Sequence, residues 1–291
     1  MRKLQPGFIL TGLVFAALWA SASVATKVGL LSAQPFVIST TRFFIAAFAM
    51  LLLSHLLMRN RLPQGREWKQ LATYGVLNIT IYLGLYVLAM QRVSAGLGSL
   101  AVAINPVIIT TVGLAWDKKA ISGRIFVSLA LGFLGVALAA YPLLQGSHAT
   151  LTGILLLIFS MLVYSGGTLY FQRNTWNDLH LLTINGWQTL FGGLFMLPFM
   201  LYFWKAESNV ADSRFWMPTL WLALAVSIGA VQTWIFLLKK YSTKASYWLF
   251  LSPIFGFLYA GILMDEPVGI WTAAGTAMVL LGLYTGTQQK G

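Results

Sequence analysis

The sequence contains no cysteine and few charged residues. Without cysteine, disulfides, iron–sulfur clusters and thiolate zinc sites are excluded. Charged residues make up 9% of the 291-residue chain, whereas a typical soluble domain has about 25%. Hydrophobic residues make up 58%, and the mean hydropathy is +0.77. Such a chain lacks the polar surface that keeps a soluble protein dissolved, so the composition indicates a protein surrounded by lipid.

Acidic residues are especially scarce, and none falls in the middle of a long apolar run. A proton-coupled exporter of cationic drugs normally needs a carboxylate inside the membrane, to bind the cation and to carry the proton. Cationic drugs therefore fit poorly as substrates, and a neutral, zwitterionic or anionic solute fits better. The seven acidic residues, all in expected loops or at expected helix ends, are Glu67, Asp117, Asp178, Glu207, Asp212, Asp265 and Glu266.

Other absences narrow the functional classes further. The three histidines, His55, His148 and His180, are scattered, so no metal site is expected. No glycine-rich phosphate loop and no nucleophile–base pair can be placed, so ATP hydrolysis and acyl chemistry are not supported, and no cofactor is expected. The net charge of +12 comes from short basic clusters between apolar runs. Because these bases do not gather on one soluble face, no nucleic-acid partner is expected.

The apolar runs predict an all-α membrane protein with ten transmembrane helices. About 20 apolar residues are needed to cross the hydrocarbon core of a bilayer. The first run follows Met1-Arg2-Lys3, as in a signal peptide, but its length of about 20 residues favours a retained helix. The expected spans are 8–28, 35–57, 70–90, 95–115, 124–142, 151–171, 181–203, 217–237, 243–263 and 268–287.

Lysine and arginine in the loops predict the orientation, because these residues concentrate in the cytoplasmic loops of membrane proteins. With a cytoplasmic N-terminus, the inner segments hold 14 of the 19 Lys and Arg residues and the outer segments hold 4, while Arg42 lies inside the second span. We therefore expect a multi-pass protein of the cytoplasmic (inner) membrane with both termini in the cytoplasm.

The two halves of the chain repeat each other. Asn105-Pro106 in the fourth span aligns with Ser252-Pro253 in the ninth, and Gly135 then falls on Gly282. This alignment predicts two five-helix repeats, residues 1–145 and 146–291. Because five is odd, the second repeat enters the membrane from the opposite side. Inverted repeats are typical of secondary transporters, with a substrate site near the middle of the bilayer between the halves.

Several short motifs occur in a particular order along nearly the whole chain. They are Leu18-Trp19-Ala20-Ser21, Pro35, Thr41-Arg42-Phe43, Leu88-Ala89-Met90-Gln91, Ser94-Ala95-Gly96, Asn105-Pro106, Ser252-Pro253, Asp265-Glu266-Pro267 and Gly282. Their order and spacing resemble the EamA-type branch of the drug/metabolite transporter superfamily. The resemblance implies ten helices in two inverted repeats and transport of small organic metabolites, often export of amino acids. The chain departs from the family at Asp117-Lys118-Lys119, where an acidic residue like Glu266 commonly ends the fourth helix.

Arg42 is the sharpest candidate for a substrate-binding residue. It lies roughly 10 Å into the second span, at about 1.5 Å per residue. A guanidinium at this depth can bind a carboxylate or a phosphate through two hydrogen bonds. The alternatives are that the side chain reaches back to the outer interface or caps the carbonyls of a neighbouring helix.

A stripe of polar and aromatic residues marks the third span. Asn78, Tyr82 and Tyr86 lie at i, i+4 and i+8 and therefore share one helix face. Such a stripe suits a cavity wall, in which the rings hold the organic part of a substrate and the polar groups orient it. Packing and hydrogen bonding between helices are the alternative. Trp234 in the eighth span aligns roughly with Tyr86 and is expected to line the opposite side.

Further candidates come from comparing the repeats. Gln188 in the seventh span is the approximate counterpart of Arg42. A neutral amide opposite a cation suits a zwitterionic or anionic ligand, and hydrogen bonding between helices is the alternative. Trp19 and Tyr164 occupy matched positions in the first and sixth spans. They either line the transport path or fill the core.

Pro106 and Pro253 interrupt the fourth and ninth spans at equivalent places. Proline lacks a backbone N–H and leaves the carbonyl of residue i−4 unpaired. The two kinks either allow the helix ends to bend during gating or produce only static curvature. Asn105, beside Pro106, either satisfies the freed backbone groups or faces the substrate.

These patterns predict a secondary transporter that moves small organic metabolites, such as amino acids or related anionic and zwitterionic solutes, by alternating access. The family resemblance implies that the direction is export. One alternative is a membrane-embedded enzyme acting on a lipid-linked substrate, which needs clustered titratable groups. Another is a channel, which needs repeated charged or carbonyl filters. The sequence shows neither pattern, so no enzyme is expected. The expected partners are a small-molecule substrate and the lipid bilayer, and the expected state is a monomer or a weak homodimer.

Overall fold

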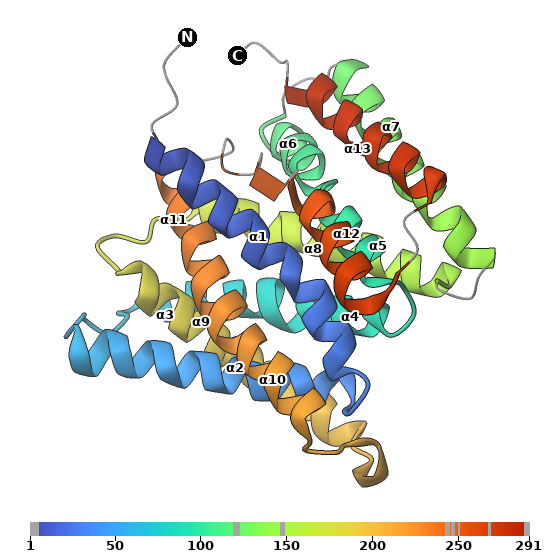
Figure 1. Ribbon diagram of the computed structural model, residues 1–291. Coiled ribbons are helices and arrows are strands. Elements are labelled where there is room, and N and C mark those ends of the chain that lie inside the picture. The colour runs from blue at the N-terminus through green and yellow to red at the C-terminus, as the bar shows by residue number, and fades with distance from the viewer. Residues whose placement is uncertain are drawn as a thin grey trace.

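The computed structural model describes residues 6–118, 123–145, 149–241, 245, 248–249, 251–266 and 269–287. Within these residues the chain forms helices and no strand, and the helices pack into one bundle (Figure 1). The first half contains α1 (Pro6–Gly29), α2 (Pro35–Leu51) with η1 (Leu52–Leu57), α3 (Arg66–Gly75) with η2 (Val76–Ile81) and α4 (Tyr82–Met90), α5 (Ala95–Val102) with α6 (Asn105–Trp116), and α7 (Gly123–Gln145).

The second half repeats this order of helices. It contains α8 (Leu151–Arg173), α9 (Leu181–Tyr202), the short turn η3 (Ala206–Ser208), α10 (Ser213–Trp221) with η4 (Leu222–Ala230) and α11 (Val231–Tyr241), α12 (Ser252–Met264), and α13 (Ile270–Thr287). Each of the ten expected spans therefore corresponds to one helical stretch, and the predicted all-α membrane fold of two inverted five-helix repeats is confirmed. Residues 243–244, 246–247 and 250 of the ninth expected span and residue 268 of the tenth lie outside the described residues.

Length and composition identify the membrane-crossing stretches among the described helices. Six stretches are long and apolar enough to cross a membrane, and three shorter helices are also apolar. Helix α9 is equally long, but Asn185, Trp187 and Gln188 lower its hydropathy. The six stretches are Ile9–Gly29, Pro35–Leu57, Arg66–Met90, Ala95–Trp116, Leu151–Arg173 and Ser213–Tyr241.

Three of the described helical stretches contain π-helical segments, in which each backbone hydrogen bond spans five residues instead of four. These segments are η1, η2 and η4. Such segments are rare and often occur at functional sites. Asn78 lies in η2 and Ser227 lies in η4, so two of the three segments supply residues to the site described below.

The fourth stretch is broken at Ala103 and Ile104, directly before Asn105-Pro106. Pro106 cannot donate a backbone hydrogen bond, and its ring clashes with the carbonyl four residues earlier. The chain closes the break with tight hydrogen bonds from Ala103 N–H to the Leu100 carbonyl (3.0 Å) and from Ile104 N–H to the Ala101 carbonyl (3.1 Å). In the second half, Pro253 occupies the first turn of α12. The gating role of the two prolines stays a prediction.

Equivalent helices of the two halves pack against each other. The extensive pairs α2–α9, α5–α12 and α7–α13 each join a helix of the first half to its counterpart in the second, and α7 and α13 lie side by side in Figure 1. A Cβ atom on Gly135 in α7 would lie 2.6 Å from the Gly275 carbonyl oxygen in α13. This close approach of two backbones requires small residues.

The bundle has two ends, which we call face I and face II. Face I carries the loops at residues 58–65 and 174–180. Face II carries the connections at residues 30–34, 91–94 and 203–212. At face II the Val210 N–H donates to the Ser32 carbonyl, and the Gln34 N–H donates to the Asn209 side chain. The connection between α9 and α10 is thereby fixed to the turn between α1 and α2.

Candidate functional site

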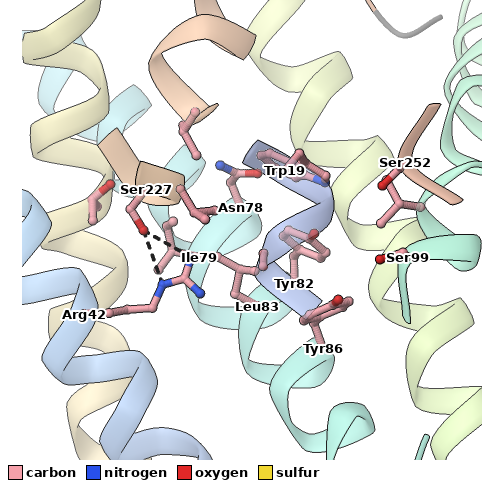
Figure 2. Close-up of a pocket in the computed structure, with 15 residues that line it drawn as sticks. Trp19, Arg42, Asn78, Ile79, Tyr82, Leu83, Tyr86, Ser99, Ser227 and Ser252 are labelled. Atoms are coloured by element: carbon pink, nitrogen blue, oxygen red, sulfur yellow. Dashed lines mark hydrogen bonds between the residues drawn. The ribbon is translucent and has the colours of Figure 1, made fainter. Parts of the chain in front are cut away.

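A small cavity lies where the two halves of the bundle meet. Its walls include Trp19 from α1, Arg42 from α2 and Tyr82 from α4 in the first half, together with Ser227 from η4 and Ser252 from α12 in the second (Figure 2). Its volume is about 30 Å³, which is enough for about one or two water molecules. An organic solute enters this space only if the surrounding helices separate.

Arg42 is the charged group of this cavity. Its residue is 6% exposed, and its Nε and Nη2 atoms both donate to the Ser227 hydroxyl, at 3.3 and 3.1 Å. The guanidinium carbon also lies 4.7 Å from the centre of the Phe43 ring. None of the ion pairs formed among the described residues involves Arg42. The cation is thus buried with one hydroxyl and one ring as its partners, and it retains donors for an anion.

Asn78 begins a chain of amide hydrogen bonds on another wall of the cavity. Its Nδ2 atom donates to Gln188 Oε1 at 3.2 Å, and Gln188 Nε2 donates to Asn185 Oδ1 at 3.1 Å. Asn185 Nδ2 then donates to the Ser227 carbonyl at 3.0 Å. Asn78 lines the cavity, whereas Gln188 is fully buried behind it. The structure therefore brings Gln188 into contact with a cavity residue, not with the cavity itself.

The aromatic residues predicted for the site form two layers. Trp19, Tyr82 and Tyr86 line the cavity. Tyr164 packs behind them, with its ring centre 4.8 Å from that of Tyr82 and 5.8 Å from that of Trp19. Trp234 stacks on Tyr164 at 6.1 Å and lies outside the lining. The first layer faces the cavity, and the second packs against the first layer.

Asn105 also lies away from the cavity. Its Nδ2 atom lies 3.2 Å from the Met161 sulfur, and its Oδ1 atom accepts from the Ser165 hydroxyl at 3.3 Å. Both partners are in α8, so Asn105 ties the broken fourth stretch to the sixth. Of the nine predicted binding residues, the structure places Trp19, Arg42, Asn78, Tyr82 and Tyr86 in the lining, and it places Asn105, Tyr164, Gln188 and Trp234 behind it.

Four polar lining residues were not predicted as binding residues from the sequence: Ser99, Thr189, Ser227 and Ser252. Each has a small hydroxyl inside an apolar helix, where such groups usually bond to their own backbone. The only available signal was at Ser252, which adjoins Pro253. Its hydroxyl is buried and has no hydrogen-bond partner among the described residues, so it is a free polar group at the cavity wall.

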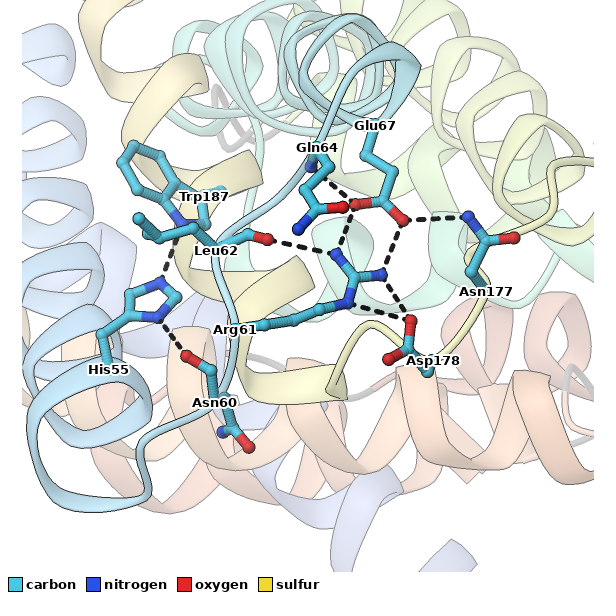
Figure 3. Close-up of polar contacts among 9 residues, drawn as sticks. All are labelled: His55, Asn60, Arg61, Leu62, Gln64, Glu67, Asn177, Asp178 and Trp187. Carbon is cyan, nitrogen blue, oxygen red and sulfur yellow. Dashed lines mark hydrogen bonds and ion pairs between the residues drawn. The ribbon is translucent and has the colours of Figure 1, made fainter.

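At face I, a polar cluster joins the two halves (Figure 3). Arg61 donates to both carboxylate oxygens of Glu67, at 2.7 and 2.8 Å, and to Asp178 Oδ1, at 2.6 and 2.9 Å. Asn177 donates to the same Glu67 at 3.0 Å. The hydrogen bonds that Arg61 donates to Glu67 and Asp178 raise the pKa of Arg61, and the hydrogen bond that Asp178 accepts from Arg61 lowers the pKa of Asp178. This arginine is therefore neutralised within the protein.

A histidine lies beside this cluster. His55 Nε2 accepts from Trp187 Nε1 at 3.0 Å, so Nδ1 carries the proton and donates to the Asn60 carbonyl at 2.9 Å. The neutral ring links η1 to α9, as Figure 3 shows. Among the described residues, no group of three His, Cys, Asp or Glu side chains is placed to hold a metal ion.

At face II, Glu266 joins the end of α12 to the start of α5. Its two carboxylate oxygens accept from the backbone N–H groups of Ala95, at 2.6 Å, and Gly96, at 3.0 Å. A carboxylate is favourable at this position because the N-terminus of a helix carries a partial positive charge. Nearby, Lys27 Nζ donates to the Met90 carbonyl at 3.1 Å. Lys119, the predicted counterpart of Glu266, lies outside the described residues.

Comparison with known proteins identifies the family. The model of the EamA-like transporter family matches this chain twice, over residues 7–141 and 151–286. An uncharacterised transporter of Archaeoglobus fulgidus is 24% identical over 272 residues, which cover 91% of this chain and 93% of the relative. A "probable amino-acid metabolite efflux pump" of Salmonella typhimurium is 22% identical over 295 residues, which cover 96% and 94%. A solved crystal structure is similar with a TM-score of 0.69 over 98% of both chains, at 16% identity.

The two family matches fall in the two five-helix halves, one ending within α7 and the other beginning at the start of α8. The Archaeoglobus and Salmonella relatives, which align over nearly the whole chain, are named a transporter and an efflux pump, not enzymes. The repeated helices, the cavity between them and these relatives lead to one conclusion: this chain is a multi-pass membrane transporter and belongs to the EamA-like transporter family.

Proposed function

We propose that the protein is a secondary exporter of small organic metabolites that carry a carboxylate, such as amino acids and related zwitterionic or anionic solutes. The observation that carries this proposal is Arg42, a buried guanidinium in the cavity without a carboxylate partner among the described residues. A buried charge that lacks a counter-charge is costly. A substrate carboxylate that accepts two hydrogen bonds from the guanidinium offsets that cost.

Alternating access fits the size and the position of the cavity. The space of about 30 Å³ is too small for an amino acid, so loading requires the helices to move apart. Residues of both halves line the cavity, and rocking of one half against the other would open it to each side in turn. Export is suggested by the relatives named as amino-acid metabolite efflux pumps.

We also propose that the protein lies in the cytoplasmic membrane with both termini in the cytoplasm, which makes face I cytoplasmic. The distribution of 14 inner and 4 outer Lys and Arg residues supports this orientation. Protease accessibility of a tag placed at either terminus, in sealed cells and in inverted vesicles, tests it. Termini on opposite sides would contradict it.

The transport proposal is tested with purified protein in proteoliposomes. Uptake is measured by counterflow with a panel of labelled zwitterionic amino acids, organic anions and organic amines. We expect saturable uptake of solutes with a carboxylate, no uptake of amines without one, and loss of uptake in Arg42→Ala. Uptake of amines alone, or full activity of a correctly inserted Arg42→Ala protein, would overturn the proposal.

A further inference from the structure

The chain of amides behind the cavity has a fixed direction. It ends on the backbone carbonyl of Ser227, an atom that only accepts hydrogen bonds. Asn185 lies 3.0 Å from this carbonyl and must present its NH₂ group to it. The Asn185 oxygen therefore faces the other way, where it accepts from Gln188 Nε2 at 3.1 Å and from the Thr189 hydroxyl at 3.4 Å.

The same reasoning fixes the next two amides. Gln188 directs its Nε2 atom to Asn185, so its Oε1 atom is directed to Asn78. This oxygen accepts a hydrogen bond from Asn78 Nδ2 at 3.2 Å. Asn185 and Gln188 are both 0% exposed, so water does not compete with these bonds. The Nδ2 atom of Asn78 thus points to Gln188 and donates one of its two N–H groups to it. The carbonyl oxygen of Asn78 has no partner among the described residues and is the atom left to face the cavity.

The cavity thus presents two unlike polar groups. Arg42 offers hydrogen-bond donors and a positive charge, and Asn78 offers an acceptor oxygen; Figure 2 shows Arg42 beside Ser227 and Asn78 beside Trp19. Both groups are anchored on Ser227, since Arg42 donates to its hydroxyl and Asn185 donates to its carbonyl. An acceptor oxygen near an aromatic ring suits a protonated amine, which has N–H donors and a positive charge.

We infer that Asn185 and Gln188 are positioning residues that hold the Asn78 oxygen toward the cavity as the acceptor for a substrate ammonium group. The site then selects solutes with both a carboxylate and a protonated amine over carboxylates that lack the amine. This inference rests on the proposed function, because it takes Arg42 as the partner of the carboxylate. Asn185 and Gln188 act through Asn78 and do not touch the solute.

The ligand-side test uses the wild-type protein in detergent and three ligands of one carbon skeleton. These are L-leucine, its deaminated analogue 4-methylpentanoate, and its N-trimethylated analogue, in which the positive charge remains but no N–H donor does. Titration calorimetry measures each Kd. We expect L-leucine to bind about tenfold more tightly than either analogue, since a hydrogen bond to a charged group contributes about 1.5 kcal/mol. Equal affinity for L-leucine and either analogue would overturn the inference.

The protein-side test uses Gln188→Met, which keeps the side-chain length and removes the amide. We expect the affinity for L-leucine to fall about tenfold, while the affinity for 4-methylpentanoate changes less than about twofold. Thr80→Val is the matched control, because Thr80 also joins η2 to α9, through a 2.9 Å bond to the Gly192 carbonyl, and lies outside the cavity lining. It should leave the ratio of the two affinities unchanged.

The outcomes separate the two proposals. If the wild type binds L-leucine and 4-methylpentanoate equally well and Arg42→Ala binds neither, the proposed function stands and the amide inference fails. If Gln188→Met lowers both affinities by the same factor, the amides are only structural and the inference again fails. If the wild type binds no ligand with a carboxylate, both proposals fail.

Discussion

Arg42 and Arg61 carry the same guanidinium group, but only Arg61 is paired with carboxylates among the described residues. Arg61 lies in the face I loop and is held by two carboxylates, Glu67 and Asp178. Arg42 lies inside a membrane-spanning helix and is held by the Ser227 hydroxyl. A cation that the protein neutralises itself stabilises the fold, whereas a buried cation left without a counter-ion is available to a ligand. The comparison therefore separates an arginine that joins the two halves from the one that we propose binds the solute.

The largest effect in testing this difference between the two arginines is expected from replacing Arg42. Truncating one partner of a buried, hydrogen-bonded charge pair costs about 2–5 kcal/mol, so Arg42→Ala should weaken carboxylate binding by about 30-fold or more. Its melting temperature should not fall, because the variant removes a buried charge that has no acidic partner among the described residues. Arg42→Lys should recover only part of the affinity, since an ammonium lacks the forked geometry of a guanidinium. Titration calorimetry and thermal unfolding in detergent measure both quantities.

Replacing Arg61 should give the opposite result. Arg61→Ala leaves Glu67, which is 4% exposed, without its cation, and a buried charge that has lost its partner is destabilising. We expect a lower melting temperature and an unchanged Kd for the solute in the folded fraction. Arg173→Ala is the control, because Arg173 pairs with an exposed carboxylate, Asp117, and such pairs contribute little. A loss of affinity without a loss of stability in Arg61→Ala would remove the distinction between the two arginines.

A smaller effect is expected at face II. Glu266→Gln keeps one acceptor for the start of α5 but removes the charge, which weakens the contact by roughly 0.5–1 kcal/mol. If this contact closes the cavity toward face II, the cavity should open there about two- to fivefold more often. Ala22 of α1 lines the cavity, and the chain contains no cysteine, so a single Ala22→Cys reports on this opening by its rate of labelling. Asp265→Asn is the matched control at the neighbouring, exposed carboxylate. If Ala22→Cys is labelled at the same rate with Glu266→Gln as without it, Glu266 does not form a gate.

The smallest expected effect is the pH dependence of the face I cluster. The hydrogen bond from Arg61 lowers the pKa of Asp178 in the folded protein. The resulting stabilisation is complete above the unfolded-state pKa of about 3.9 and is lost as the pH falls through the lower folded-state pKa. The melting temperature of the wild type should therefore fall more steeply than that of Asp178→Asn below about pH 4. The two proteins should show the same pH dependence between about pH 5 and pH 8; a difference there would contradict the assignment.

The fold could be predicted from the sequence because apolar runs of membrane length are unambiguous. The charge distribution and the aligned Asn105-Pro106 and Ser252-Pro253 motifs predicted two inverted repeats. The packing of α2 against its counterpart α9 agrees with this prediction. The boundary between the repeats at residues 145 and 146 stays a prediction. So does the substrate role of every predicted site residue.

The site could be predicted only in part. Asn78, Tyr82 and Tyr86 all reach the cavity, as their shared helix face suggested. Matching positions in the repeats did not place Gln188 or Trp234 in the lining, because packing decides how far each helix is rotated about its axis. The π-helical turns around Asn78 and Ser227 shift that rotation further, and the sequence has no marker for them. Ser227 itself is an ordinary small residue in an apolar run.

Ser227 has a consequence for how a solute is released. Its hydroxyl steadies the cation of Arg42 in α2, and its carbonyl anchors the amides of α9 that orient Asn78. Both contacts involve one residue of η4, so any sliding or turning of η4 against α2 and α9 changes both at once. If Arg42 and Asn78 bind the two ends of a zwitterion as we propose, a single shift of this one helix weakens both contacts together and no second trigger is needed.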